Sequence, residues 1–150
     1  MSHIIPTPLF EKTDETKRLL IKSLSLDERN VNGSVKDDFY DFIRKLELPV
    51  GNDVVVSFTH DFSLENEEYR LEVNEKITVY SSGEAGKVFA LQTLKQLLFE
   101  YGRTIPFIAI KDKPKYKIRG FMLDVGRYFY PVDDVKLFIR KMSLHKLNFL

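Results

Sequence analysis

The stretch from Lys117 to Leu150 constrains the fold most, because it has the pattern of a buried strand, a helix and the start of a second strand. The first strand is predicted from a short apolar run, interrupted only by Asp124, that is typical of strands covered on both faces: Phe121, Met122, Leu123 and Val125. Pro131 suits the first position of the helix, since its φ is fixed and it lacks an N–H. Strand, helix and strand form the repeating unit of parallel sheets and barrels.

The predicted helix has acidic residues at its start and basic residues near its end, as the helix dipole favours. These are Asp133 and Asp134, then Arg140, Lys141, His145 and Lys146. Apolar residues recur at helical spacing, and a second apolar run follows: Val135, Phe138, Ile139 and Met142, then Leu147, Phe149 and Leu150. We expect the unit to be incomplete, because the chain stops in its second strand.

Composition excludes several classes of function. At 150 residues, with 43% hydrophobic and 30% charged residues, the chain suits one domain or one domain plus a fragment. A net charge of +1 creates no overall electrostatic field that would attract nucleic acid or an anionic membrane. Without cysteine there are no disulfides or thiolate nucleophiles. We find no signal peptide and no run of about 18 apolar residues, so we expect a cytoplasmic protein with no membrane partner.

The first part of the chain predicts a mixed sheet with one amphipathic helix. Residues 3–8 are expected to be extended at a sheet edge, because two prolines cannot both donate to a ladder, and residues 13–17 to form a loop. A strand is predicted over residues 20–26. Ser34, with Asp37 three residues later, resembles a capping box that begins a helix ending before Pro49.

The middle of the chain predicts a strand, a hairpin and a second helix. Residues 54–59 alternate like a strand, and residues 69–73 and 77–81 form a hairpin around Asn74 and Glu75. Ser81 or Ser82 is expected to cap a deeply buried helix that stops at Gly102. An extended piece over 105–110 and a linker over 111–115 follow. The expected fold class is α+β, a mainly antiparallel sheet with two helices on one face, followed by a βα fragment of a barrel.

Four stretches of the chain resemble one known protein family. Residues 69–98, ending in LQTLKQLL, are similar to the hairpin and helix of the domain that precedes the family's barrel, and residues 105–114 to the link into it. RGFMLDVGRYF, Arg119–Phe129, resembles the signature of the first barrel strand, with Tyr128 where the family usually has His. His145-Lys146-Leu147-Asn148 resembles the family's H-K-x-N at the second strand. The match keeps the order and spacing of these motifs, and the family that the chain resembles is glycoside hydrolase family 20, the β-N-acetylhexosaminidases.

The resemblance implies an accessory α+β domain over residues 1–113 and the start of a catalytic barrel over residues 114–150. Family members remove terminal N-acetylhexosamines from glycans without a cofactor, and the substrate's own acetamido oxygen attacks the anomeric carbon. An Asp-Glu pair serves that chemistry from a later strand, so no catalytic residue is expected before Leu150. A barrel needs about 250 residues. The chain alone is therefore expected to be an inactive scaffold.

Arg119 is the candidate substrate-binding residue. By resemblance it corresponds to the family arginine that holds hydroxyls of the terminal sugar, and a guanidinium fork suits two adjacent oxygens. Without the resemblance, a surface or ion-paired arginine is the commoner interpretation. Asp124 within an apolar run needs a cation or several donors, and Arg127 is an available partner, which predicts a structural ion pair.

The remaining polar residues predict no further site. The histidines, His3, His60 and His145, lack metal-binding spacing, so no metal is expected. Gly83, Gly86 and Gly102 suit cap or turn roles better than phosphate binding. The alternating lysines suit a solvated linker better than a polyanion or glycan contact: Lys111, Lys113, Lys115 and Lys117.

A second interpretation comes from another class of function, a non-enzymatic interaction module. The apolar residues after Pro114 would normally be covered by further barrel strands. Without them we expect residues 115–150 to pack back on the first domain, to mediate a homodimer, or to be poorly ordered.

Overall fold

The computed structural model describes residues 3–150. The chain divides into two compact units, Met1–Lys113 and Pro114–Leu150. The first contains a six-stranded sheet and two α-helices, and the second contains one helix. Among the described residues, no helix is both long enough and apolar enough to cross a bilayer.

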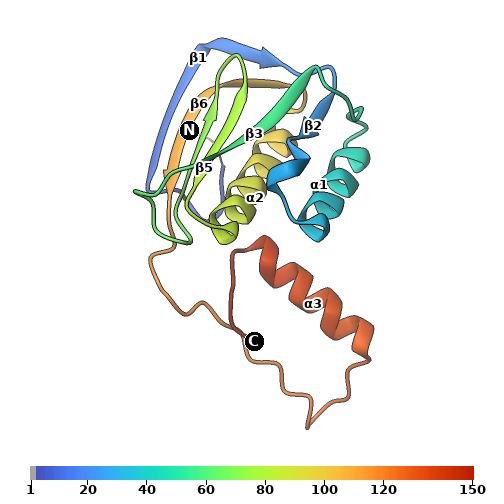
Figure 1. Ribbon diagram of the computed structural model, residues 1–150. Coiled ribbons are helices and arrows are strands. Elements are labelled where there is room, and N and C mark those ends of the chain that lie inside the picture. Colours follow the sequence, from blue (N-terminus) through green and yellow to red (C-terminus); the bar gives the residue numbers. More distant parts are fainter. Residues whose placement is uncertain (1–2) are drawn as a thin grey trace. The chain divides into compact units, whose positions relative to one another are not determined.

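The sheet of the first unit has the order β1-β6-β4-β5-β3-β2 (Figure 1). Its strands are β1 Phe10–Leu20, β2 Leu24–Leu26, β3 Val54–His60, β4 Tyr69–Val73, β5 Ile77–Ser81 and β6 Thr104–Asp112. The pairs β1–β6, β6–β4 and β4–β5 are antiparallel, whereas β5–β3 and β3–β2 are parallel. The predicted α+β class with a mainly antiparallel sheet is confirmed.

Both helices of this unit cover one face of the sheet. Leu71 in β4 is in register with Val79 in β5 and with Ile110 in β6, and all three are fully buried. This period of two places every second residue against α2, Glu84–Tyr101, which lies beside α1, Gly33–Lys45 (Figure 1). Helix α2 is buried over most of its surface, whereas α1 buries only Phe39 and Ile43.

The hairpin is confirmed, but two helix caps differ from the prediction. The side chain of Asn32, not Ser34, caps α1 by accepting from the backbone N–H of Ser34 at 3.1 Å. Helix α2 begins after Gly83 without a side-chain cap, and Ser82 Oγ donates to the carbonyl of Glu65 instead, at 2.9 Å. Gly102 ends α2 with a φ of 63°, as predicted, because this left-handed conformation favours glycine.

The start of the chain corrects three sequence predictions. Residues 13–17 are not a loop but the middle of β1, which pairs with β6 through its backbone and shifts register between Asp14 and Arg18. The strand expected over 20–26 is interrupted, because β1 ends at Leu20 and β2 begins at Leu24. Residues 3–8 belong to no strand. β1 was not predicted because most of its side chains are exposed and many are charged. An edge strand that pairs through its backbone does not need alternating apolar residues.

A buried polar network joins β4, α2 and β6. The Tyr69 hydroxyl lies 2.6 Å from Thr93 Oγ1 and donates to Asp112 Oδ2 at 3.2 Å. Burial, and then the nearby charge of Asp112, raise the pKa of Tyr69 well above its ordinary value of 10.0, so the phenol stays protonated. Asp112 is the last residue of β6, and the network therefore holds the end of that strand.

In the second unit the predicted helix is present and the predicted first strand is not. Helix α3, Val132–Leu144, begins one residue after Pro131, with Asp133 and Asp134 in its first turn. Residues 121–125 form no ladder, and the only strand-type pairing within 114–150 is a single parallel bridge between Gly120 and Phe149. A β-strand is stabilised by hydrogen bonds to neighbouring strands. Within residues 114–150 the short segment at Phe149 is the only neighbour that pairs in this way.

Candidate functional site

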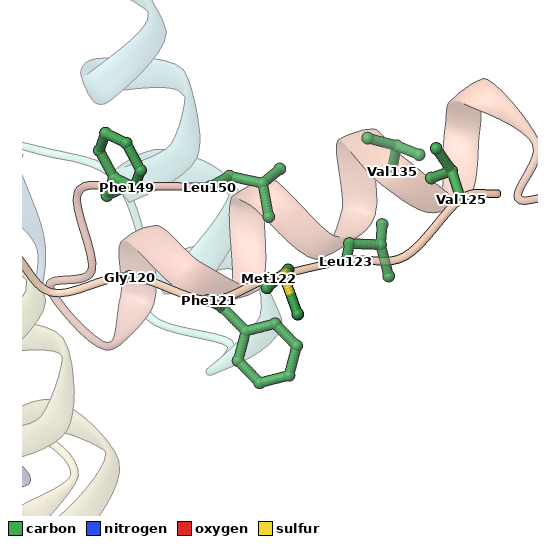
Figure 2. A pocket seen from close by; sticks show the side chains of 8 residues that line it. All are labelled: Gly120, Phe121, Met122, Leu123, Val125, Val135, Phe149 and Leu150. Atoms are coloured by element: carbon green, nitrogen blue, oxygen red, sulfur yellow. The ribbon is translucent and has the colours of Figure 1, made fainter. Parts of the chain in front are cut away.

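The second unit contains an open apolar groove of about 600 Å³ (Figure 2). It is bounded by the extended segment after Arg119, by one residue of α3 and by the end of the chain. Its lining residues are Gly120, Phe121, Met122, Leu123, Val125, Val135, Phe149 and Leu150. None of them has a titratable side chain, so the groove has no acid, base or nucleophile of its own.

Gly120 allows the two segments of this unit to meet. A Cβ added there would lie 3.1 Å from the Phe149 carbonyl oxygen and 3.2 Å from its Cβ. One residue on, the Phe121 N–H donates to that carbonyl at 3.0 Å. The missing side chain therefore permits the parallel bridge.

Arg119 lies directly before this bridge and contacts the segment that follows α3. Its Nε donates to the carbonyl of Lys146 at 2.7 Å, and its Nη1 donates to the carbonyl of Tyr116 at 2.6 Å. Its backbone N–H donates to Asn148 Oδ1 at 3.0 Å, and its carbonyl accepts from the Asn148 N–H at 2.9 Å. The R-G and H-K-x-N motifs are thus in contact, although they lie more than 20 residues apart.

Asn148 completes this junction, although no role was predicted for its side chain. Its amide accepts from Arg119 and donates to the carbonyl of Lys117 at 2.9 Å. Lys146, beside it, is only 3% exposed and has a φ of 59°. An asparagine amide can pair with two backbone groups at once, and the H-K-x-N motif that ends at Asn148 was the signal that pointed to this position.

Asp124 forms the predicted ion pair with Arg127, which confirms that interpretation of the two residues. Arg127 Nε lies 3.1 Å from Asp124 Oδ2, and Oδ1 accepts from the N–H groups of Gly126 and Arg127 at 2.9 and 3.0 Å. The pair is exposed rather than buried, with Arg127 91% accessible. It shapes the turn that ends the extended segment. Tyr128 is exposed, and its ring centroid lies 5.4 Å from that of Tyr130.

The other predicted residues lie apart from this junction. His3 contacts Glu100, His60 packs edge-on against Phe62, and His145 follows α3. Within residues 3–150 no three acidic, histidine or cysteine side chains gather as metal ligands would. Lys111 lies within β6 and pairs with Glu68, so the predicted linker begins after Asp112 and not at residue 111, whereas Lys113 follows the strand and pairs with Glu65.

Comparison with protein families gives two adjoining matches. Residues 3–113 match the model for glycosyl hydrolase family 20, domain 2, and residues 116–150 match the model for the family 20 catalytic domain. A β-N-acetylhexosaminidase of Cellulomonas fimi is 36% identical over 101 residues, which cover 65% of this chain and 20% of that protein. A β-hexosaminidase of Vibrio vulnificus is 26% identical over 98% of this chain and 18% of its own length. The chain thus spans about a fifth of these relatives.

Solved structures agree with this assignment. The family 20 exo-β-N-acetylglucosaminidase of Vibrio harveyi in complex with N-acetylglucosamine superimposes with a TM-score of 0.79 at 25% identity, covering 99% of this chain and 25% of that one. The β-N-acetylhexosaminidase of Bacteroides fragilis gives a TM-score of 0.77 at 29% identity, covering 97% and 32%. The two family matches together take in almost every described residue, and the chain belongs to glycosyl hydrolase family 20.

Proposed function

We propose that this chain is the non-catalytic N-terminal part of a β-N-acetylhexosaminidase. In this proposal residues 1–113 form the accessory domain and residues 114–150 form the first strand and helix of the catalytic barrel. The complete enzyme would remove terminal N-acetylhexosamines from glycans. The substrate's acetamido group would act as nucleophile, with a Glu acid/base and an assisting Asp contributed from beyond Leu150.

The observation that carries the proposal is the junction between Arg119 and the segment around Lys146 and Asn148. A parallel bridge between Gly120 and Phe149 follows it directly, as expected where two neighbouring strands of a parallel barrel begin to pair. The Arg119 guanidinium donates through Nε and Nη1 to backbone carbonyls. We propose that this anchoring fixes the plane of the guanidinium, as a group that positions hydroxyls of the sugar requires.

The accessory domain is proposed to act as a scaffold. The network of Tyr69, Thr93 and Asp112 is buried in its core and ends one residue before the boundary at Lys113. A rigid end to β6 would fix the point from which the barrel chain departs. This role needs no catalytic group in residues 1–113.

The test is hydrolysis of a chromogenic N-acetyl-β-glucosaminide by the 150-residue chain and by a version extended with the next several hundred codons of its gene. We expect activity only in the extended protein. Activity in the short chain, or in neither, would contradict the proposal.

The role of Arg119 is tested within the active, extended protein. Arg119→Lys should reduce kcat/KM by about 10- to 100-fold, because hydrogen bonds to a charged group contribute about 1.5–3 kcal/mol. Arg127→Lys is the matched control, since Arg127 pairs only locally with Asp124, and it should stay near wild type. Equal effects of the two changes would exclude a substrate role for Arg119.

An alternative function is a non-enzymatic module that self-associates through the second unit. The observation that favours it is the exposure of apolar side chains around the groove, of which Met122 is 85% accessible. A stop codon directly after Leu150 in the gene, together with a dimer in light scattering, would favour this alternative over the enzyme.

A further inference from the structure

The segment His3–Ile5 lies against helix α2 and is held there by side chains of that helix. Gln96 makes two hydrogen bonds to a single residue of the segment. The Ile5 N–H donates to Gln96 Oε1 at 2.7 Å, and Gln96 Nε2 donates to the Ile5 carbonyl at 2.9 Å. The primary amide thus pairs with one residue's backbone as a neighbouring strand would.

Glu100, one helical turn further on, binds the residue at the other end of the segment. The His3 N–H donates to Glu100 Oε2 at 3.0 Å, and His3 Nδ1 lies 3.1 Å from Oε1. Gln96 and Glu100 therefore bind backbone N–H groups of Ile5 and His3, which lie two positions apart in the sequence. The spacing of four residues places both side chains on the same face of α2.

Between these contacts, Ile4 enters the hydrophobic core. Its side chain is only 3% exposed and belongs to the core cluster, whereas Ile5 points outward and is 67% exposed. Proteins often bind extended peptides through main-chain hydrogen bonds, with alternate side chains buried. This segment has both features, since polar side chains hold its backbone and Ile4 is buried while Ile5 is exposed.

We propose that this face of α2 is a peptide-binding site, occupied in cis by the chain's own N-terminal segment. Gln96 recognises backbone groups of any sequence, Glu100 contacts both the backbone N–H and the imidazole of His3, and the space that Ile4 fills in the core selects an aliphatic side chain. The expected ligand is an extended peptide with a central aliphatic residue. The backbone N–H groups of the two residues on either side of it face the helix. The site is independent of the proposed hydrolase function.

The proposal is tested in the 150-residue chain with Ile4→Asn, which removes the anchor and vacates the site. A labelled peptide with the sequence of residues 3–9, HIIPTPL, should then bind in trans, as measured by fluorescence anisotropy. Gln96→Ala added to this variant should weaken binding at least about tenfold, because two hydrogen bonds contribute about 1 kcal/mol each. The control peptide HNIPTPL should not bind.

Binding of both peptides alike, or binding unaffected by Gln96→Ala, would overturn the proposal. A second measurement covers the case in which Ile4→Asn does not fold. In the chain carrying only Gln96→Ala, amide hydrogen exchange at Ile5 should be about tenfold faster, while the Leu71 amide in β4 keeps its rate. An unchanged rate at Ile5 would also overturn the proposal.

Discussion

At the scale of single residues, Gly86 shows what the sequence could not reveal. A Cβ at this position would lie 2.5 Å from the Glu68 carbonyl oxygen and 3.0 Å from the Ser81 Cβ. We expect Gly86→Ala to lower the free energy of unfolding by up to about 2 kcal/mol. Overpacking costs about 1–3 kcal/mol and outweighs the gain in helix propensity of about 1 kcal/mol. Urea denaturation measures the change.

Gly33 provides the control, because it is also a helical glycine but no atom beyond its chain neighbours and its own helix backbone lies within 4 Å of its added Cβ. Gly33→Ala should leave stability unchanged or raise it by up to about 1 kcal/mol. Equal losses for both variants would refute the steric explanation. The sequence correctly assigned Gly83 and Gly102 to helix ends, but the role of Gly86 depends on a loop distant in sequence, and no local pattern contains that information.

At the scale of elements, the connection 61–68 between β3 and β4 makes stability depend on pH. Glu68 accepts from the Glu65 N–H at 3.0 Å and pairs with Lys111 at 3.2 Å. The hydrogen bond first, and the lysine second, lower the pKa of Glu68 below its ordinary value of 4.5, against the effect of burial. The stabilisation is therefore complete above the unfolded-state pKa, and it is lost as the pH falls through the lower, folded-state pKa.

We expect Glu68→Gln to be about 1–2 kcal/mol less stable than wild type at pH 7, since it loses hydrogen bonds to a charged group. The difference should shrink below about pH 4.5 and vanish once the carboxyl is protonated in both states. Urea denaturation from pH 3 to 7 measures it. Glu75→Gln, at the exposed hairpin turn, should change stability by less than about 0.5 kcal/mol. A pH-independent loss for Glu68→Gln would contradict the ionic origin.

Elements with strong apolar periodicity were predictable, and those without it were not. The alternation in β4 and β5 and the wide apolar face of α2 located both correctly, because burial dictates residue choice there. β1 was missed because its residues are mostly exposed and charged, and its strand conformation comes from backbone pairing with β6. The first strand of the second unit was predicted from its apolar run, but a run of residues supplies no hydrogen-bonding neighbours.

At the scale of the whole molecule, the two units should differ in local stability. In the second unit only Met142 and Lys146 are buried, whereas the first unit has a large core. We expect amides in β4, β5 and α2 to exchange far more slowly than that of Phe121, although the latter is hydrogen-bonded. Hydrogen exchange measured by mass spectrometry compares them. Equal protection would mean that the second unit is covered, and light scattering would then show whether a second copy covers it.

The candidate site was predictable only through its motifs. Arg119 and the segment 145–148 were identified by resemblance, and the structure brings them together. The role of Arg119 toward a sugar stays a prediction. The groove beside it could not be foreseen, because it arises from the path of two segments that meet at a residue without a side chain.

The register shift in β1 has a consequence for how the protein behaves at high concentration. β1 is an edge of the sheet, and its irregularity between Asp14 and Arg18 interrupts the even row of donors and acceptors that another strand would need. Charged side chains flank the same stretch. Ordered fibrillar stacking through this edge is therefore disfavoured, and the first unit should stay soluble under conditions that drive flat-edged sheets to polymerise.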